Sequence, residues 1–418
     1  MSMTRSDAAD APFRRLPAVR PGHGFDLLDG VRVLDLTTSV AGPYATLLLA
    51  DLGAEVIKVE RPGGGDDARA WGPPFLDAES LWFLSVNRNK QSITLDTTSD
   101  AGRAVLHDLV RACDVVIVNQ IPRTAKKLGL DAATLTALKS DLIYVSITGF
   151  GLAGERADLA CYDLIAEGYS GVMDLTGAAE SEPQKIGAPA ADMLAGEDAA
   201  LATVAALFAR MKSGRGRVVD VSLTESMTRF LACRIVPYLG SGEVPRRSGA
   251  KDSVIAIYQT FETADAPITL GLANDGIWTR FWQAVGDPEF GADPRYDSNA
   301  KRRTARGAIV TRIQEVLRQK PRAEWLALFG AARVPAGPIN RVDEVASDPH
   351  LAARGLFYRL ADGRREVPQI GTGFWLDGAA NVPRSAPPRL GEHTQSVLKS
   401  VLGYSDERIQ ALAADRIT

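Results

Sequence analysis

The segment Ile186–Gly196, IGAPAADMLAG, holds one acidic residue among small and apolar ones. That residue, Asp192, precedes an alanine-rich run that predicts a helix over about 196–212. An aspartate near the start of a helix often serves as its N-cap. A carboxylate with small neighbours can also act as a nucleophile toward a bound substrate. Both interpretations of Asp192 stay open from the residues alone, and a second acid, Asp163, either lines a pocket or is structural.

A second group of residues could bind phosphate. Arg61 stands just before the glycine run Gly63–Gly65; a guanidinium pairs bidentately with phosphate, and glycine N–H groups can cradle it. Lys126 and Lys127 would add contacts if they lie at the same edge of the fold, and otherwise form a solvated pair. The segment Gly149–Gly154, GFGLAG, matches a dinucleotide-binding spacing, but the charged run after it favours an ordinary loop.

Other kinds of chemistry lack the residues they need. The chain has four histidines and three cysteines, none of them clustered, so neither a zinc site nor a Ser–His–Asp or Cys–His set is predicted. An odd, sparse set of cysteines favours a reducing cytoplasm over a disulfide framework. The net charge of −3 argues against bulk binding to nucleic acid or membranes. No apolar run approaches the roughly 20 residues that a membrane-spanning helix needs.

Alternating strands and helices must position these residues. The stretch Val31–Glu60, VRVLDLTTSVAGPYATLLLADLGAEVIKVE, predicts a strand, a turn with N-cap hydroxyls at 37–39, a helix over about 44–52, and a second strand. The pattern is typical of an α/β protein with a parallel sheet, and the first turn should lie at its carboxyl edge, where ligands bind. Further strands are predicted at 92–95, 114–119, 142–148 and 218–222.

Shifts in composition predict two domains and a tail. The smaller domain should contain strands at Val254–Ile257 and Ile268–Leu272, and Val334–Pro338 should be the linker that leaves it. The predicted divisions are a flexible N-terminal tail (1–24), the N-terminal part of a large domain (25–232), a small domain (233–333), and a linker with a C-terminal part that returns to the large domain (334–418).

The chain resembles the class III CoA-transferases, the family of formyl-CoA transferase and carnitine CoA-transferase. The matching segments follow the family's order over roughly residues 27–400. They are LLDGVRVLDLTTSVAGPYATLLLADLGAEVIKVERPGGGD, NRNKQSITLD, CDVVIVNQ, LIYVSITGFG, CYDLIAEGYSG, APAADMLAG, KSGRGRVVDVSL, VPAGPINRVDEVASDP and RLGEHT. The resemblance implies a large Rossmann-like, CoA-binding domain built from both chain ends, a smaller α/β middle domain, and a homodimer interlocked like links of a chain.

The resemblance also implies a reaction. The family's nucleophile lies in the segment matching APAADMLAG, so Asp192 would attack an acyl-CoA thioester and form first a mixed anhydride and then an aspartyl-CoA thioester. CoA is a substrate here, and no tightly bound cofactor is implied. The second partner is a small carboxylic acid. Carried over by position, the residues that would bind CoA are Val40, Ala41, Arg61, Leu95, Asn119 and Lys127, and those that would shape the acyl pocket are Tyr162 and Trp71.

Two departures from formyl-CoA transferase bear on the substrate. Val40 stands where that enzyme has a glutamine that orients the acyl group, and no tetraglycine loop is visible between Val236 and Gly271. A carboxylic acid pair other than formate and oxalate is therefore expected. An α-methylacyl-CoA racemase of the same family and a non-catalytic CoA-binding protein are the alternatives. Tyr162 stands where the racemase has its histidine, and tyrosine, with a reference pKa of about 10, is a weak base at pH 7.

Overall fold

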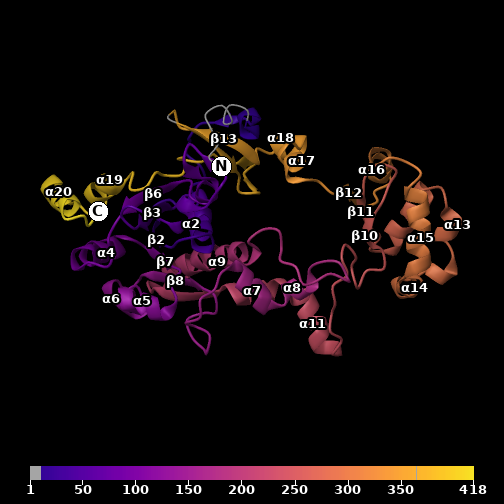
Figure 1. The fold of residues 1–418 in the computed structure, drawn as a ribbon, viewed down its shortest axis with the longest axis horizontal. Helices are drawn as coiled ribbons and strands as arrows, with labels where there is room; N and C mark the ends of the chain where they lie inside the picture. Colours follow the sequence, from indigo (N-terminus) through magenta and orange to yellow (C-terminus); the bar gives the residue numbers. More distant parts are fainter. Residues whose placement is uncertain (1–10, 364) are drawn as a thin grey trace. The chain divides into compact units, whose positions relative to one another are not determined.

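The computed structural model describes residues 11–363 and 365–418. The chain divides into two compact units, whose elements are labelled in Figure 1. Because the first unit is assembled from separate stretches of chain, residues far apart in the sequence share one core. Unit 1 comprises Met1–Ser170, Gly187–Ala232 and Asp348–Thr418, and unit 2 comprises Gly171–Ile186 and Cys233–Ser347.

Unit 1 is built on a six-stranded parallel sheet with the order β6-β3-β2-β7-β8-β9 (Figure 1). The chain enters at β2, proceeds outward through β3 and β6, and returns to the other side of β2 at β7. In open α/β sheets such a reversal leaves a crevice at the carboxyl ends of the strands, where ligands bind. The strands are β2 (Arg32–Leu36), β3 (Glu55–Glu60), β6 (Lys90–Thr94), β7 (Val115–Val118), β8 (Ile143–Thr148) and β9 (Arg217–Ser222).

Helices cover both faces of this sheet. On one face α2 and α9 pack against each other and against the strands. On the other face α4, α6, α19 and α20 form a core with alternate side chains of the strands, such as Leu34 and Leu36. The helices of unit 1 are α2 (Ala41–Asp51), α3 (Leu81–Ser85), α4 (Asp100–Ala112), α5 (Pro122–Leu128), α6 (Ala132–Leu138), α7 (Asp163–Ser170), α9 (Ala190–Ser213), α10 (Leu223–Phe230), α18 (Pro349–Ala353), α19 (Thr394–Ser400) and α20 (Asp406–Ala414).

A smaller sheet joins the two ends of the chain. β1 (Ala18–Val19) pairs parallel with β13 (Phe357–Ala361), which pairs antiparallel with β14 (Glu366–Ile370). Phe13 is buried beside it. The tail predicted for residues 1–24 therefore contains packed structure from residue 11 onward, and residues 1–10 lie outside the described residues. Two short hairpins complete unit 1, β4 (Phe75–Leu76) with β5 (Glu79–Ser80) and β15 (Trp375–Leu376) with β16 (Ala379–Ala380).

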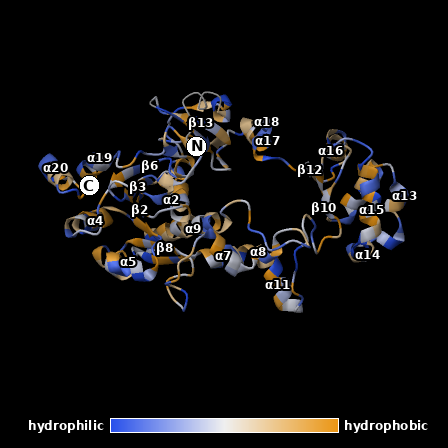
Figure 2. Cartoon of the chain, in the orientation of Figure 1, coloured by the Kyte–Doolittle hydropathy of each residue, from blue (hydrophilic) through white to orange (hydrophobic). Residues whose placement is uncertain are grey.

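Unit 2 combines an antiparallel sheet, β10-β11-β12, with a layer of helices. Its core is aromatic, with Trp278, Trp282 and Phe329 fully buried. Figure 2 shows hydrophilic and hydrophobic residues together along α15, as expected of a helix with one buried side. The elements are β10 (Tyr258–Phe261), β11 (Ile268–Gly271), β12 (Ala336–Pro338), α8 (Val172–Leu175), α11 (Ala232–Ser241), α12 (Asp275–Ala284), α13 (Pro288–Gly291), α14 (Asn299–Thr304), α15 (Arg306–Leu317), α16 (Arg322–Ala331) and α17 (Val342–Ala346).

Two predictions for this unit are wrong. No strand forms at Val254–Ile257, because Asp252 Oδ1 accepts the N–H groups of Val254 (2.7 Å) and Ile255 (2.8 Å) and folds the segment into a turn. The segment predicted as a linker contains β12, which pairs with β11, so the chain returns to unit 1 only at Asp348. The mixed α/β class with a parallel sheet is confirmed.

Candidate active site

The turn between β2 and α2 forms one wall of the site. Asp35 accepts hydrogen bonds through Oδ1 from the N–H (3.0 Å) and hydroxyl (2.5 Å) of Thr37, and through Oδ2 from the Thr46 hydroxyl (2.7 Å). The N-cap of α2 is Val40, with no side-chain cap bond, so the N-cap role predicted for residues 37–39 is wrong. The first N–H groups of α2, those of Ala41 and Gly42, lack partners within the helix, and Pro43 has no N–H.

A buried ion pair fixes the conformation of this turn. Ser39 adopts the left-handed region (φ 73°), which is unfavourable for a residue with a side chain. Its N–H donates to Asp66 Oδ1 (2.9 Å), and Asp66 Oδ2 pairs with Lys58 Nζ at 2.8 Å. Lys58 Nζ also donates to the Thr37 carbonyl oxygen (2.8 Å). Burial alone would lower the pKa of Lys58, but the charges of Asp35 and Asp66 raise it, so the ammonium stays charged.

A second buried lysine supports the start of α2. Lys90 Nζ donates to the Pro43 carbonyl oxygen (2.8 Å) and to Asn87 Oδ1 (2.8 Å), and it lies 3.2 Å from Asp35 Oδ2. Burial, with the nearby charge of Lys58, lowers the pKa of Lys90 to about 8 despite the attraction of Asp35. These contacts tie the turn and the first residues of α2 to β2, β3 and the segment leading into β6.

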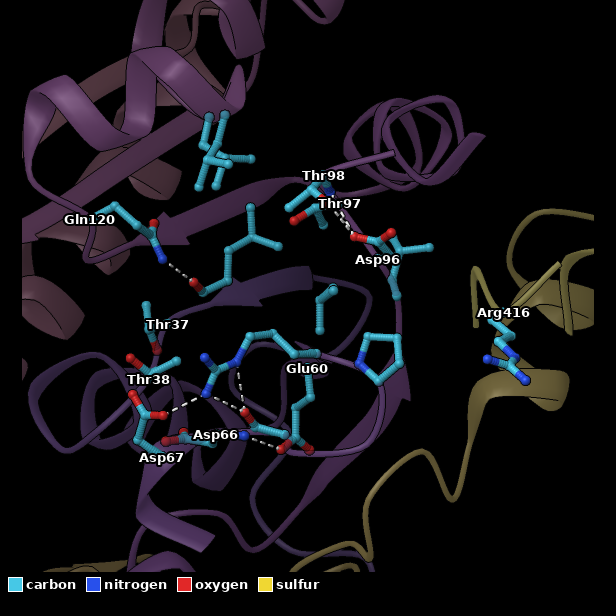
Figure 3. A pocket seen from close by; sticks show the side chains of 18 residues that line it. Thr37, Thr38, Glu60, Asp66, Asp67, Asp96, Thr97, Thr98, Gln120 and Arg416 are labelled. Atoms are coloured by element: carbon cyan, nitrogen blue, oxygen red, sulfur yellow. Dashed lines mark hydrogen bonds and ion pairs between the residues drawn. The ribbon is translucent and has the colours of Figure 1, made fainter. Parts of the chain in front are cut away.

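A cavity of about 550 Å³ opens beside this turn, at the carboxyl edge of the sheet (Figure 3). It follows the ends of β2, β3, β6 and β7, which is the crevice that the strand order predicts. Its floor is apolar and its rim polar. The lining residues are Leu36, Thr37, Thr38, Val59, Glu60, Arg61, Pro62, Gly65, Asp66, Asp67, Leu95, Asp96, Thr97, Thr98, Gln120, Leu128, Leu130 and Arg416.

The structure brings only part of the predicted CoA site into this cavity. Arg61 and Leu95 line it. Asn119 does not, but it exchanges two hydrogen bonds with the Thr38 backbone (3.2 and 2.8 Å) and so holds the turn against β7. Val40 and Ala41 are buried at the start of α2, next to the lining residues.

The remaining predicted residues lie outside the cavity lining. Lys127 is exposed on α5, where its neighbour Leu128 reaches the cavity instead. Trp71 packs edge-on against Trp82, with ring centroids 5.9 Å apart. The side chain of Tyr162 is largely exposed just before α7.

Asp192 is the third residue of α9, whose N-cap is Pro189. The N-cap interpretation of Asp192 is therefore wrong, and Asp163 performs that task from 28 residues earlier: its Oδ1 accepts the N–H of Ala191 (2.8 Å) and of Asp192 (3.2 Å). Among the described residues no donor bonds the Asp192 carboxylate. Burial first, and the charge of Asp163 second, raise its pKa to about 7.

The carboxylate of Asp192 also has a thiol for a neighbour. Burial and the charge of Asp192 raise the pKa of Cys161 to about 11. Cys161 in turn packs on Gly149, where an added Cβ would lie 2.1 Å from the cysteine Cβ. The Gly149–Gly154 segment is thus a loop that shapes the surroundings of Asp192, as the loop interpretation predicted.

Close helix packing places Asp192 near the β2–α2 turn. Gly196 lies against α2 so tightly that an added Cβ would be 2.8 Å from the Ala41 carbonyl oxygen. Asp192 is one helical turn before Gly196 and on the same side of α9. The start of α9 therefore lies close to the start of α2.

Sequence reasoning missed several of these residues. The sequence does indicate that Asp35, Lys58 and Lys90 are paired, because charged residues in strands covered on both faces need a partner. The capping role of Asp163 and the cavity contact of Arg416 depend on tertiary structure and had none. Within the described ranges, no three His, Cys, Asp or Glu side chains group as a metal site requires. No described helix combines the length and apolar character needed to cross a membrane.

The sequence profile of CoA-transferase family III matches residues 28–394. This chain belongs to that family. It is 40% identical to the succinate–glutarate CoA-transferase of Agrobacterium fabrum over 380 residues, which are 89% of this chain and 94% of that protein. It is 36% identical to the succinyl-CoA:glutarate CoA-transferase of Mus musculus over 388 residues, 92% and 88% of the two chains. A CaiB/BaiF family protein from Brucella suis has a similar crystal structure, with a TM-score of 0.79, 38% identity, and coverage of 90% of this chain and 100% of that chain.

These findings confirm the predicted family, the CoA-transferase activity, and CoA thioesters as substrates. The racemase and the non-catalytic binding protein gain no support, since both named relatives are transferases. In this CoA-transferase the carboxylate of Asp192 is half-buried, and burial with the charge of Asp163 raises its pKa.

Proposed function

We propose that this CoA-transferase exchanges CoA between short dicarboxylic acids, with succinyl-CoA and glutarate as one pair, through covalent intermediates on Asp192. The observation that carries the proposal is the Asp192 carboxylate, which no described donor bonds, at the start of α9 beside the N-terminus of α2. The acids come from the names of the two relatives.

The cavity at the sheet edge would hold the nucleotide end of CoA. Arg61 would meet phosphate, and Leu95 would pack on the adenine. Val40 and Ala41 would run beside the pantetheine arm as it leads toward Asp192. Asn119 would act indirectly by fixing Thr38. Lys127, exposed on α5, would contribute to the field around the phosphates, while Tyr162 and Trp71 would shape the acyl pocket.

The reaction would proceed in two symmetrical halves. A carboxylate oxygen of Asp192 attacks the thioester carbonyl, the C–S bond breaks, and CoA thiolate leaves an acyl–aspartyl anhydride. The thiolate then attacks the Asp192 carbonyl, the anhydride C–O bond breaks, and the donor acid leaves as its carboxylate. The acceptor carboxylate repeats these steps in reverse order on the aspartyl-CoA thioester. No net proton is consumed, and Asp192 must be ionised at the start.

The surroundings of Asp192 favour this sequence. A poorly hydrated carboxylate is more nucleophilic than one bonded to several donors. The free N–H groups at the N-terminus of α2 would stabilise the oxyanions that form at each step. A valine at residue 40 leaves an apolar wall where formyl-CoA transferase has a polar group, which supports acids larger than formate.

The proposed assembly is the interlocked homodimer. Leu201, Phe208 and Met211 are 68%, 60% and 85% exposed on α9. Their spacing places them along one side of the helix, an apolar stripe that a second copy would cover. Sedimentation velocity tests this directly, and a monomer at micromolar concentration contradicts it. A cytoplasmic location stays a prediction from the three free cysteines.

The decisive experiment follows CoA exchange between succinyl-CoA and glutarate. Wild type should form glutaryl-CoA, and Asp192→Asn should lose transfer while keeping its fold. Asp158→Asn is the control, because Asp158 lies in an exposed loop and accepts only the Arg123 N–H. Mass spectrometry of trapped turnover mixtures should find CoA on the Asp192 peptide. Normal turnover by Asp192→Asn would refute the mechanism, and α-proton exchange with deuterated water without CoA transfer would favour a racemase.

A further inference from the structure

The last residues of the chain close one side of the cavity at the sheet edge. After α20, the Ile417 carbonyl oxygen accepts the Asp96 N–H (2.7 Å), and the Ile417 N–H donates to the Leu412 carbonyl oxygen (2.9 Å). The Ile417 side chain is buried in the core of unit 1. These contacts fix Ile417 and thereby hold the preceding residue, Arg416, at the cavity wall.

The backbone of Arg416 is in an unfavourable conformation. Its φ of 58° is in the left-handed region, where glycine is the usual residue just after a helix. A side chain there costs conformational free energy. Residues held in such conformations gather at ligand-binding sites, so the arginine at this position calls for a functional explanation.

The other charged residues of the cavity lining interact with one another or with neighbours and not with Arg416. Arg61, the other lining cation, is paired with Asp67. Among the described residues no carboxylate forms an ion pair with Arg416, which is among the lining residues and is exposed. The lining carboxylates all have partners: Glu60 with Arg69, Asp66 with Lys58, Asp67 with Arg61, and Asp96 with Thr98.

We infer that Arg416 binds the ribose 3′-phosphate of CoA and sets the preference for CoA over 3′-dephospho-CoA. This inference rests on the proposed CoA site. Figure 3 shows Arg416 well apart from Thr37 and Thr38, which belong to the β2–α2 turn. Of the two phosphate groups of CoA, the pyrophosphate is attached to the pantetheine arm and the 3′-phosphate lies at the far end of the molecule. The cation farthest from the turn is therefore matched to the 3′-phosphate.

The test measures binding of CoA and of 3′-dephospho-CoA by titration calorimetry, together with kcat and KM for succinyl-CoA. Arg416→Gln should weaken CoA binding about 10- to 150-fold, the value of one charge-assisted contact, and leave 3′-dephospho-CoA binding and kcat unchanged. Arg416→Lys should recover part of the loss. Arg408→Gln, on the helix α20 that precedes Arg416 and outside the cavity lining, is the matched control and should bind both ligands like wild type.

Arg416→Gly separates binding from folding. Glycine adopts a positive φ without strain, so this variant should unfold at a higher temperature and still bind CoA more weakly. If Arg416 had only a structural role, the melting temperature and the affinity for CoA would change in the same direction. Equal loss for both ligands, or no loss for either, in Arg416→Gln overturns the inference while the CoA site stands. A wild-type protein that binds neither ligand overturns the CoA site itself.

Discussion

Replacing Asp163 by asparagine removes one negative charge beside Asp192 and keeps an oxygen that can accept the two N–H groups at the start of α9. The pKa of Asp192 is raised from 3.8 to about 7, by burial first and by Asp163 second. As the smaller of two contributions to a difference of about 3 pH units, Asp163 supplies at most about 1.5 of them, equivalent to at most about 2 kcal/mol.

The sign of the effect follows from the reaction. Asp192 must be ionised to attack the thioester, so transfer by wild type should fall as the pH drops through about 7. In Asp163→Asn the midpoint of the kcat/KM profile should move to lower pH, by at most about 1.5 units. At pH 6 the ionised fraction, and with it the rate relative to the plateau, should be higher than in wild type, by up to about 8-fold.

The assay is the pH dependence of kcat/KM for succinyl-CoA between pH 5 and 9. Asp131→Asn is the matched control, because Asp131 accepts the Thr134 N–H (3.1 Å) at the start of α6 and does not contribute to the pKa of Asp192. Its profile should coincide with that of wild type, including any titration of the substrate phosphates. A midpoint in Asp163→Asn that equals or exceeds the wild-type value would refute the electrostatic argument.

Three further predictions use the same contacts. Asp192→Asn should stabilise the fold at pH 8 by up to about 4 kcal/mol, and by less at pH 5. The reason is that a carboxylate with a raised pKa destabilises the folded chain only as the pH rises from 3.8 toward 7. Thermal melts of wild type and variant at both pH values measure the difference. Gly196→Ala should lower the free energy of unfolding by about 1–3 kcal/mol in urea, because the new Cβ meets the Ala41 carbonyl, and an unchanged value would contradict the close packing. Lys58→Met should lower it by about 3–5 kcal/mol, because Asp66 then keeps a buried charge without its partner, and an unchanged free energy of unfolding would contradict the role of this ion pair.

The parallel sheet could be predicted because its central strands are continuous apolar runs. The segment 142–148 was expected as a strand and forms β8, Ile143–Thr148, buried along its whole length. The segment Val254–Ile257 has similar residues but forms no strand. Its backbone N–H groups donate to Asp252, which is a nearer acceptor than another strand. A run of β-branched residues therefore predicts a strand only when no side chain just before it competes for the backbone.

Only those parts of the candidate site that depend on a single distinctive residue could be predicted from the sequence. Asp192 stands out as a lone acid among small residues, and the structure gives it an environment that raises its pKa. Its capping partner Asp163 and the close approach of Gly196 to α2 follow from tertiary structure. Lys127 and Trp71 were carried over by position and lie outside the cavity lining, since a shared position in the chain does not fix where a surface side chain points.

The contribution of the last residues to the core of unit 1 bears on how the protein is made. Val397, Leu398, Tyr404, Ile409 and Ile417 complete the hydrophobic layer over β2, β3 and β6. During translation the first strands leave the ribosome long before these residues, so the part of this face that α19 and α20 cover stays open until both helices have been made. A premature stop codon that removes only the final helix would leave apolar surface open to chaperones and proteases. Synthesis of α19 and α20 is thus the step that completes the cover of this face of the sheet.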